Sequence, residues 1–490
     1  MNSHPSRSLP NISLFLFSSV ALASAVFLTS VHSLALLPGV TSHYDNKRTL
    51  ELILIGLGLL VIVFFPQLIE SVLSHSKRKN TLLVLSGIVC LGLASALLAQ
   101  SPRHALLEFS LLAGLALFSL LATRFWQRYQ IQGLLIYVAT LAISACIYMT
   151  GFYAGYLAAF LEDIPLRWPE PFYGFSSVRF FNQYQIWTFA LFSLPMLLLP
   201  TLRPVLRRSM HMLLICWWVL LFASGSRGAI IAILLAYVAT AIIYRQFALP
   251  LIWHQLLTLM FGLALYAVLF QVLPLFLAPD TDIASVNRWS GSGRLALWLT
   301  AVEVIQQNPL LGIGPMHYAS LPNVTNNHPH SSLLQWASEW GIPSTLLLLG
   351  LVGSSLHSWI QRFNARTLKT ESISPEIPPA IPVVLFCTLI GGMSYSLVSG
   401  VIVTPMSQIL MVIVVGLMLG VYCQNQTKFL AHKIDRIAYR LVAGSILILL
   451  SWSVLPEFTP RLMDQTQFLS NQSTSVGPRL WLSGGIPRHQ

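Results

Sequence analysis

Residues 251–277 read LIWHQLLTLMFGLALYAVLFQVLPLFL and contain no Asp, Glu, Lys or Arg. About 20 apolar residues are enough for a helix to cross the hydrocarbon core of a bilayer. Inside that core a helix satisfies every backbone N–H and C=O group within its own segment, which an open strand cannot do. This stretch therefore predicts a transmembrane helix.

The rest of the chain repeats the pattern. Of its 490 residues, 55% are hydrophobic and 9% are charged, against roughly a quarter charged in a soluble globular protein. We predict an all-α polytopic membrane protein with about twelve to thirteen transmembrane helices. The other expected spans are 12–38, 50–73, 81–100, 104–123, 133–158, 183–200, 209–224, 228–248, 331–358, 381–398, 405–423 and 441–455.

The net charge of +12 would be compatible with a nucleic-acid partner. However, if the N-terminus is cytoplasmic, most Lys and Arg residues fall on short inner loops, where basic residues set the orientation of a membrane protein. We therefore expect the basic charge to fix topology, and we expect no nucleic-acid partner.

The loops differ in length on the two sides, and the longer ones lie outside. Residues 1–277 are expected to form an N-terminal transmembrane bundle of about nine spans. An outer loop at 278–330 would contain a short interfacial helix, the C-terminal transmembrane helices would occupy 331–455, and a polar outer tail would occupy 456–490. Loops on a rigid scaffold often carry function, so we expect the site on the outer side.

Three arginines stand out on the outer side: Arg227 and Arg179 at the ends of expected spans, and Arg294 directly before the expected interfacial helix. Arg227 lies in a short turn, SGSRGA, Arg294 follows the glycine-rich SGSG, and Arg179 precedes FFNQ. A guanidinium group presents a planar set of donors that suits phosphate, and the N–H groups at a helix start favour the same anion. We therefore predict a diphosphate site. The alternative is that each arginine reaches lipid headgroups or pairs with a carboxylate.

A second polar cluster follows the outer loop. His328 and His330 flank a proline just before an apolar helix, and Gln335 and Glu339 are four residues apart on one face of it. Histidine is well suited to proton transfer near neutral pH, so His330 is the candidate base and His328 a candidate contact. The spacing of these groups is not diagnostic of a metal site, and the five cysteines show no metal-ligand spacing. We expect no metal or other cofactor.

With these blocks the chain resembles the O-antigen ligase superfamily, which also contains O-linked oligosaccharyltransferases and O-antigen polymerases. The resemblance lies in four segments: RFFNQYQ at 179–185, SGSRGA at 224–229, GSGRLALWLTAVEVIQQNPLLGIGPMHY at 291–318 and HPHSSLLQWASEWG at 328–341. Their order and spacing also agree.

The resemblance implies a glycosyltransferase of the bacterial inner membrane that acts on the periplasmic side. Its donor would be a glycan on undecaprenyl diphosphate, held by Arg227 and Arg294, with His330 as base or stabiliser of the leaving group. Many members have Asn after this histidine, whereas this chain has Ser331. Further candidate substrate contacts are Arg179, Asn182, Gln185, His328, Gln335, Glu339 and Tyr395.

The acceptor is left open by the sequence. It could be lipid A–core or a pilin-type protein, with membrane lipids as the surroundings, or a growing glycan if the protein is a polymerase. A transporter or flippase for a lipid-linked glycan is the alternative from another class. It would need a polar path through the inner half, where the spans are strongly apolar.

Overall fold

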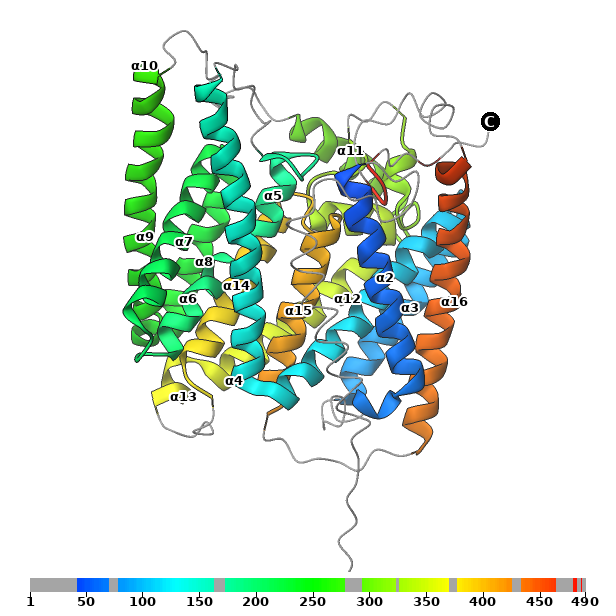
Figure 1. Ribbon diagram of the computed structural model, residues 1–490. Helices are drawn as coiled ribbons and strands as arrows, with labels where there is room; N and C mark the ends of the chain where they lie inside the picture. Colours follow the sequence, from blue (N-terminus) through cyan, green and yellow to red (C-terminus); the bar gives the residue numbers. More distant parts are fainter. Residues whose placement is uncertain are drawn as a thin grey trace, which may run out of the picture.

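The computed structural model describes residues 42–69, 78–162, 172–277, 293–322, 326–369, 377–424, 433–463, 479–482 and 486. Throughout these ranges the secondary structure is helical, without a strand. The helices stand side by side in one bundle whose two ends carry the connecting segments (Figure 1). The prediction of an all-α polytopic membrane protein is confirmed.

The helices follow one another along the chain in this order: α2 (His43–Phe64), α3 (Arg78–Leu97), α4 (Pro102–Leu161), α5 (Val178–Gln185), α6 (Phe189–Leu198), α7 (Pro204–Ala223), α8 (Arg227–Tyr244), α9 (Leu249–Ala267), α10 (Leu273–Leu277), α11 (Arg294–Gln307), α12 (Ser332–Phe363), α13 (Ala365–Lys369), α14 (Ala380–Ser396), α15 (Pro405–Tyr422) and α16 (Lys433–Met463). Short 3-10 turns lie at Pro66–Leu68, Arg245–Phe247 and His317–Ser320, and a π-helical turn at Val268–Val272 joins α9 to α10.

Each expected span from 50–73 onward coincides with one or two of these helices, whereas the expected span at 12–38 lies outside the described residues. By length and composition, eight helices of the described chain can cross a membrane, and α14 is a shorter apolar helix. The 60-residue α4 counts once among the eight. At 1.5 Å per residue it would be about 90 Å long if straight, far more than a bilayer needs. It breaks at Gln130, where the backbone is not helical, so it covers both expected spans 104–123 and 133–158.

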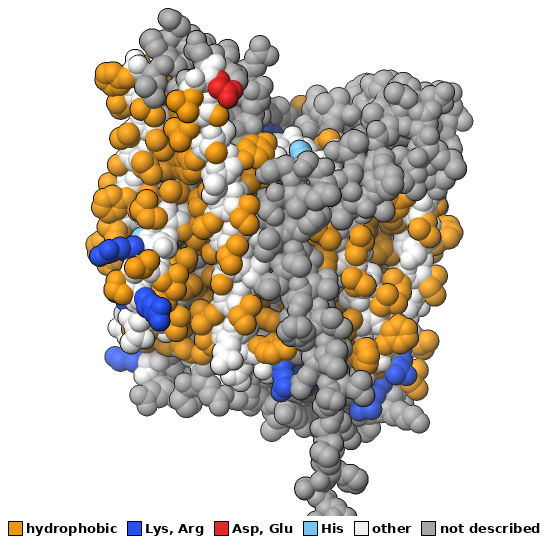
Figure 2. Space-filling model, viewed as in Figure 1, with side chains coloured by type: hydrophobic (Ala, Val, Ile, Leu, Met, Phe, Trp, Pro, Cys, Tyr) orange, Lys and Arg blue, Asp and Glu red, His pale blue; other side chains and the backbone are white. Residues whose placement is uncertain are grey.

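The side of the bundle is apolar and its charges lie toward the ends. Hydrophobic side chains cover the visible side, and the visible Lys and Arg side chains lie mainly toward the lower end (Figure 2). This lower end holds α13 and the exposed Arg203, Arg207, Arg208 and Arg245. The opposite end holds α11 and the start of α2 (Figure 1), and we call it the α11 end.

A break in α12 joins the segment after α11 to the bundle. Gly341 has φ +81°, and Pro343 lacks an N–H group, so nearby carbonyls lose their helical partners. The free carbonyl groups of Ser338 and Glu339 accept hydrogen bonds from the backbone of Ile313 and Gly314, at 2.9 and 3.0 Å. A side chain at Gly341 would overlap the Leu310 carbonyl oxygen, so the close approach requires glycine.

The region expected as a polar tail begins inside a helix, and its described residues 479–482 pack against the bundle. α16 continues to Met463, and residues 479–482 pack beside the upper end of α2 (Figure 1). There the Tyr44 hydroxyl donates to the Arg479 carbonyl oxygen at 2.8 Å.

Candidate functional site

Residues from distant segments meet at the α11 end. The Ser226 hydroxyl, in the turn before Arg227, is hydrogen-bonded to the Tyr395 hydroxyl at 3.1 Å. Arg294, at the start of α11, is close enough to Arg179 and Tyr395 for their charges to act on it. The charges of both arginines also act on His330. We call Arg179, Arg294, His328 and His330 the arginine–histidine cluster; Arg227 and Tyr395 belong to the elements at its border.

The loop before α12 holds the two histidines in a fixed arrangement. His330 has φ +54°, a left-handed conformation that is uncommon for a residue with a side chain. Its backbone N–H donates to Nδ1 of His328 at 3.2 Å, and the two rings are nearly perpendicular with centroids 4.2 Å apart. Trp298 of α11 donates to the Pro329 carbonyl oxygen at 3.0 Å. This hydrogen bond holds the histidine loop against α11. The strained backbone conformation of His330 is of a kind often found at functional sites.

Four polar atoms of the cluster are buried without a hydrogen-bond partner among the described residues. Both ring nitrogens of His330, Nε2 of His328 and Nε of Arg294 make no hydrogen bond. Most buried polar atoms in proteins do have a partner, so such a group of exceptions needs an explanation. A bound polar ligand would satisfy these atoms.

The electrostatics favour an anion. No ion pair recorded for the described residues includes Arg179 or Arg294. Burial and then the charge of Arg179 lower the pKa of Arg294. Burial, Arg179 and Arg294 together lower the pKa of His330 to about 3, and burial also lowers the pKa of His328. Both imidazoles are therefore neutral near pH 7 and able to accept a proton, while the described residues provide no carboxylate paired with either arginine.

The start of α11 adds hydrogen-bond donors. Its N-cap is Gly293, with φ +64°, and among the described residues no side chain caps the first turn. The first backbone N–H groups of a helix have no partner within the helix and carry a partial positive charge. Arg294 thus begins a helix whose end can bind an anion.

Glu339 and Gln335, expected as substrate contacts, are used inside the protein. Glu339 is fully buried; its Oε1 accepts from the Tyr318 backbone N–H at 3.0 Å and its Oε2 accepts from Arg479 at 2.6 Å. With its amide oxygen turned toward Arg479, Gln335 accepts from both terminal guanidinium nitrogens at 2.9 Å. Arg479 was not among the predicted residues, and these contacts favour a structural role for the pair on α12.

Asn182 and Gln185 lie within the bundle beneath the α7–α8 turn. The Asn182 amide donates to Gln185 at 3.2 Å and to the Ser224 hydroxyl at 2.9 Å, and Gln185 donates to the Trp217 carbonyl oxygen at 2.7 Å. The Asn182 side-chain oxygen is buried without a partner. These contacts support the turn that carries Arg227. They favour a role for Gln185 in positioning this turn, and not in contacting the substrate.

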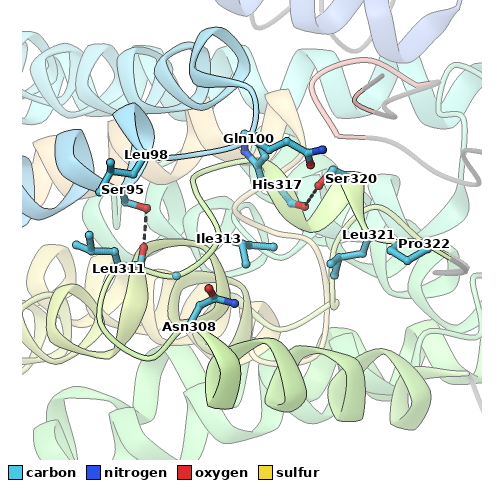
Figure 3. A pocket seen from close by; sticks show the side chains of 11 residues that line it. Ser95, Leu98, Gln100, Asn308, Leu311, Ile313, His317, Ser320, Leu321 and Pro322 are labelled. Carbon is cyan, nitrogen blue, oxygen red and sulfur yellow. Dashed lines mark hydrogen bonds between the residues drawn. The ribbon is translucent and has the colours of Figure 1, made fainter. Parts of the chain in front are cut away.

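A pocket of about 440 Å³ opens beyond the other end of α11 (Figure 3). Gln100, Asn308 and Ser320 contribute polar side chains to its wall, and no residue of the arginine–histidine cluster lines it. His317 is fixed in this wall, because its Nε2 accepts from the Ser101 backbone N–H at 2.9 Å and its Nδ1 is bonded to the Pro315 carbonyl oxygen at 2.8 Å. The pocket is therefore separate from the cluster.

Within the described ranges, no group of three His, Cys, Asp or Glu side chains could hold a metal ion. The residues that gather at the α11 end are arginines, histidines and hydroxyl groups, a set suited to phosphate oxygens and proton transfer.

Comparison with known proteins gives one family. Residues 212–349 match the family model described as O-antigen ligase. The matched range contains Arg227, Arg294, His328 and His330. A comparison with curated proteins gives no match. Through residues 212–349, the chain is thus similar to the O-antigen ligase family, in agreement with the resemblance seen in the sequence.

Proposed function

We propose that this protein transfers a glycan from undecaprenyl diphosphate to an acceptor hydroxyl at the α11 end of the bundle. The observation that carries the proposal is the arginine–histidine cluster. Among the described residues, two arginines without an ion pair lie beside the buried imidazole of His330, which has no hydrogen-bond partner there. A diphosphate supplies a negative charge for these arginines, and the acceptor hydroxyl supplies the proton for His330.

The chemistry is a displacement at the anomeric carbon. The acceptor oxygen forms a bond to that carbon while the bond from the carbon to the diphosphate oxygen breaks, and its electron pair leaves with the diphosphate. Arg294, Arg227 and the start of α11 stabilise the charge that grows on the leaving group, which is often a large catalytic contribution. The acceptor hydroxyl gives its proton to His330.

Donor binding also makes His330 a better base. In the protein alone its pKa is about 3, because it is buried next to two positive charges. A diphosphate placed between the arginines and the ring offsets those charges and raises the pKa, since a nearby anion favours the protonated imidazole. The base is thus activated when the donor is in place.

The orientation follows from charge. The basic α13 end suits the cytoplasmic face of a bacterial inner membrane, and this supports a periplasmic position for the cluster at the other end. A lipid-linked donor is already activated, so the reaction there needs no nucleotide sugar.

The test is transfer by the full chain in proteoliposomes with an undecaprenyl diphosphate–linked glycan. We expect His330→Ala and Arg294→Ala to lower turnover by about 10²-fold or more, the range of general-base and electrostatic contributions. Arg203→Ala, at the opposite end of the bundle, is the control and should retain full turnover. Full activity in either cluster variant would rule out this function.

Acceptor identity requires a deletion strain. Loss of long-chain lipopolysaccharide with accumulation of lipid-linked glycan would indicate transfer to lipid A–core, and a change in pilin mobility alone would indicate a protein acceptor. Lipopolysaccharide carrying single repeats would indicate the polymerase alternative. Complementation with His330→Ala distinguishes loss of an enzyme from loss of a structural protein, because this variant should restore only a structural role.

The transporter alternative finds less support. The inner half does contain polar groups: Gln255 donates to the Phe189 carbonyl oxygen and to Ser193, both at 2.7 Å, and accepts from Tyr237 at 2.9 Å. These groups bond to one another across helices, which favours a role in helix packing.

A further inference from the structure

Arg479 is a buried cation that joins two helices of the bundle. Its side chain is 2% exposed, and its guanidinium group bonds Glu108 of α4 at 2.6 Å and Glu339 of α12 at 2.6 Å. Nε of the same group donates to Glu108 at 3.0 Å. The planar fork of arginine can serve several acceptors at once, which a lysine ammonium group does with less geometric control.

The segment 479–482 is anchored independently of that side chain. Besides the Tyr44 contact, Nε of Arg48 donates to the Leu480 carbonyl oxygen at 3.0 Å, and the Leu482 N–H donates to Asp45 at 2.7 Å. α2 thus holds the backbone of the segment, while the Arg479 side chain extends to α4 and α12.

The contacts of Arg479 continue to both elements of the arginine–histidine cluster. Its partner Glu339 lies on the second turn of α12, the helix that begins directly after the histidine loop. Glu339 also accepts from the Tyr318 N–H, and the Tyr318 hydroxyl donates to the Leu297 carbonyl oxygen in the first turn of α11 at 2.8 Å. One cation therefore stabilises the helix after His330 and, through Tyr318, the helix that begins with Arg294.

We propose that Arg479 is a positioning residue for glycan transfer: it ties α12 and α11 to α4 through Glu339 and Glu108, and so fixes His330 relative to Arg294. This rests on the proposed function. The side chain does not need to touch the substrate, since its contacts are made within the protein.

The first test compares turnover with donor binding. Arg479→Gln removes the cation and leaves two carboxylates facing each other, while Arg479→Lys keeps the charge without the fork. We expect Arg479→Gln to lower kcat by about 10²-fold, the effect of misplacing groups by about 1 Å, with the donor KM nearly unchanged. Arg479→Lys should restore part of kcat.

Arg103→Gln is the matched control. Arg103 pairs with Glu457 at 2.6 Å and joins α4 to α16 at the same end, without a contact to α12 in the described structure. This variant also loses an arginine–glutamate ion pair that joins two helices, with a more exposed arginine, and its kcat should stay near that of the wild type. A folded Arg479→Gln protein with normal kcat would overturn the proposal.

The second test does not depend on activity. Amide hydrogen exchange of the full chain should accelerate in 293–300 and 326–341 in Arg479→Gln, with 204–223 of α7 unchanged, and Arg103→Gln should leave both cluster segments protected. Uniform acceleration throughout the bundle would mean loss of general stability and would also overturn the proposal. If His330→Ala and Arg294→Ala are fully active, the proposed function fails; the local exchange result then still reports separately on whether Arg479 fixes the two segments.

Discussion

At the scale of single residues, His330 combines burial, strain and positive neighbours. When folding lowers the pKa of a histidine, the folded state is stable with the neutral imidazole and loses stability under conditions where the unfolded chain binds a proton. For His330 the ordinary pKa is 6.5 and the folded value is about 3, so the contribution is fully present above pH 6.5 and is lost as the pH falls toward 3, because only the unfolded chain takes up the proton there. The neutral state that suits a base therefore also makes the protein sensitive to acid.

We predict that His330→Asn reduces this sensitivity. Asparagine tolerates the left-handed backbone and does not titrate, so the variant should lose less stability between pH 6.5 and 5 than the wild type, by up to about 1.4 kcal/mol per pH unit. Thermal unfolding of the purified protein in detergent at the two pH values measures this difference. The exposed His357→Asn is the control and should leave the pH dependence as in the wild type; equal slopes for all three proteins would contradict the prediction.

The same scale shows what the sequence could predict about the site. The arginines and histidines can be recognised from local sequence, because each stands at an outer span end, after a glycine-rich stretch or beside a proline. The spacing of Glu339 and Gln335 predicts that they share one helix face, but it does not show which residue their side chains contact. That partner, Arg479, is 140 residues away from Glu339 and 371 from Glu108, and no local pattern reports a pairing over such separations.

At the scale of elements, the broken helix α12 connects the histidine loop to the segment after α11. We predict that Gly341→Ala destabilises the protein strongly, because the backbone there has φ +81° and a Cβ would overlap the Leu310 carbonyl oxygen. Strain and overlap at such positions account for the larger effects of single substitutions, several kcal/mol. The yield of monodisperse protein after extraction and its thermal midpoint should both fall.

Gly350→Ala in the same helix is the comparison. A Cβ there would meet no atom within 4 Å, and alanine is the better helix former. This variant should match or slightly exceed the wild type in thermal midpoint. A neutral effect at both positions would show that the break at Gly341 is not required for folding.

Elements also show why span prediction was sound but helix limits were not. A long apolar run indicates that a segment is surrounded by lipid, where it must be helical. Every expected span within the described residues contains helix. The run at 183–200 is divided into α5 and α6, and 251–277 contains a π-helical turn. Such breaks depend on packing partners, including Trp217 and Ser224 beside α5, which hydropathy cannot indicate.

At the scale of the whole molecule, the two ends of the bundle should face different compartments. In a cysteine-free variant, a single cysteine at the exposed Ser176 of the α11 end should react with a membrane-impermeant maleimide added to spheroplasts. A cysteine at the exposed Arg208 should react only after the membrane is opened, because basic ends remain cytoplasmic. The reverse pattern would place the arginine–histidine cluster on the cytoplasmic face and remove the basis for a periplasmic reaction.

The position of Arg479 has a consequence for biosynthesis. The two helices that carry its partners, α4 and α12, end more than 100 residues before it in the chain. During translation both can therefore enter the membrane before the cation for Glu108 and Glu339 has been made. A chain that stops short of Arg479 would carry both buried carboxylates without that cation, a local defect by which quality-control proteases could distinguish it from the complete protein.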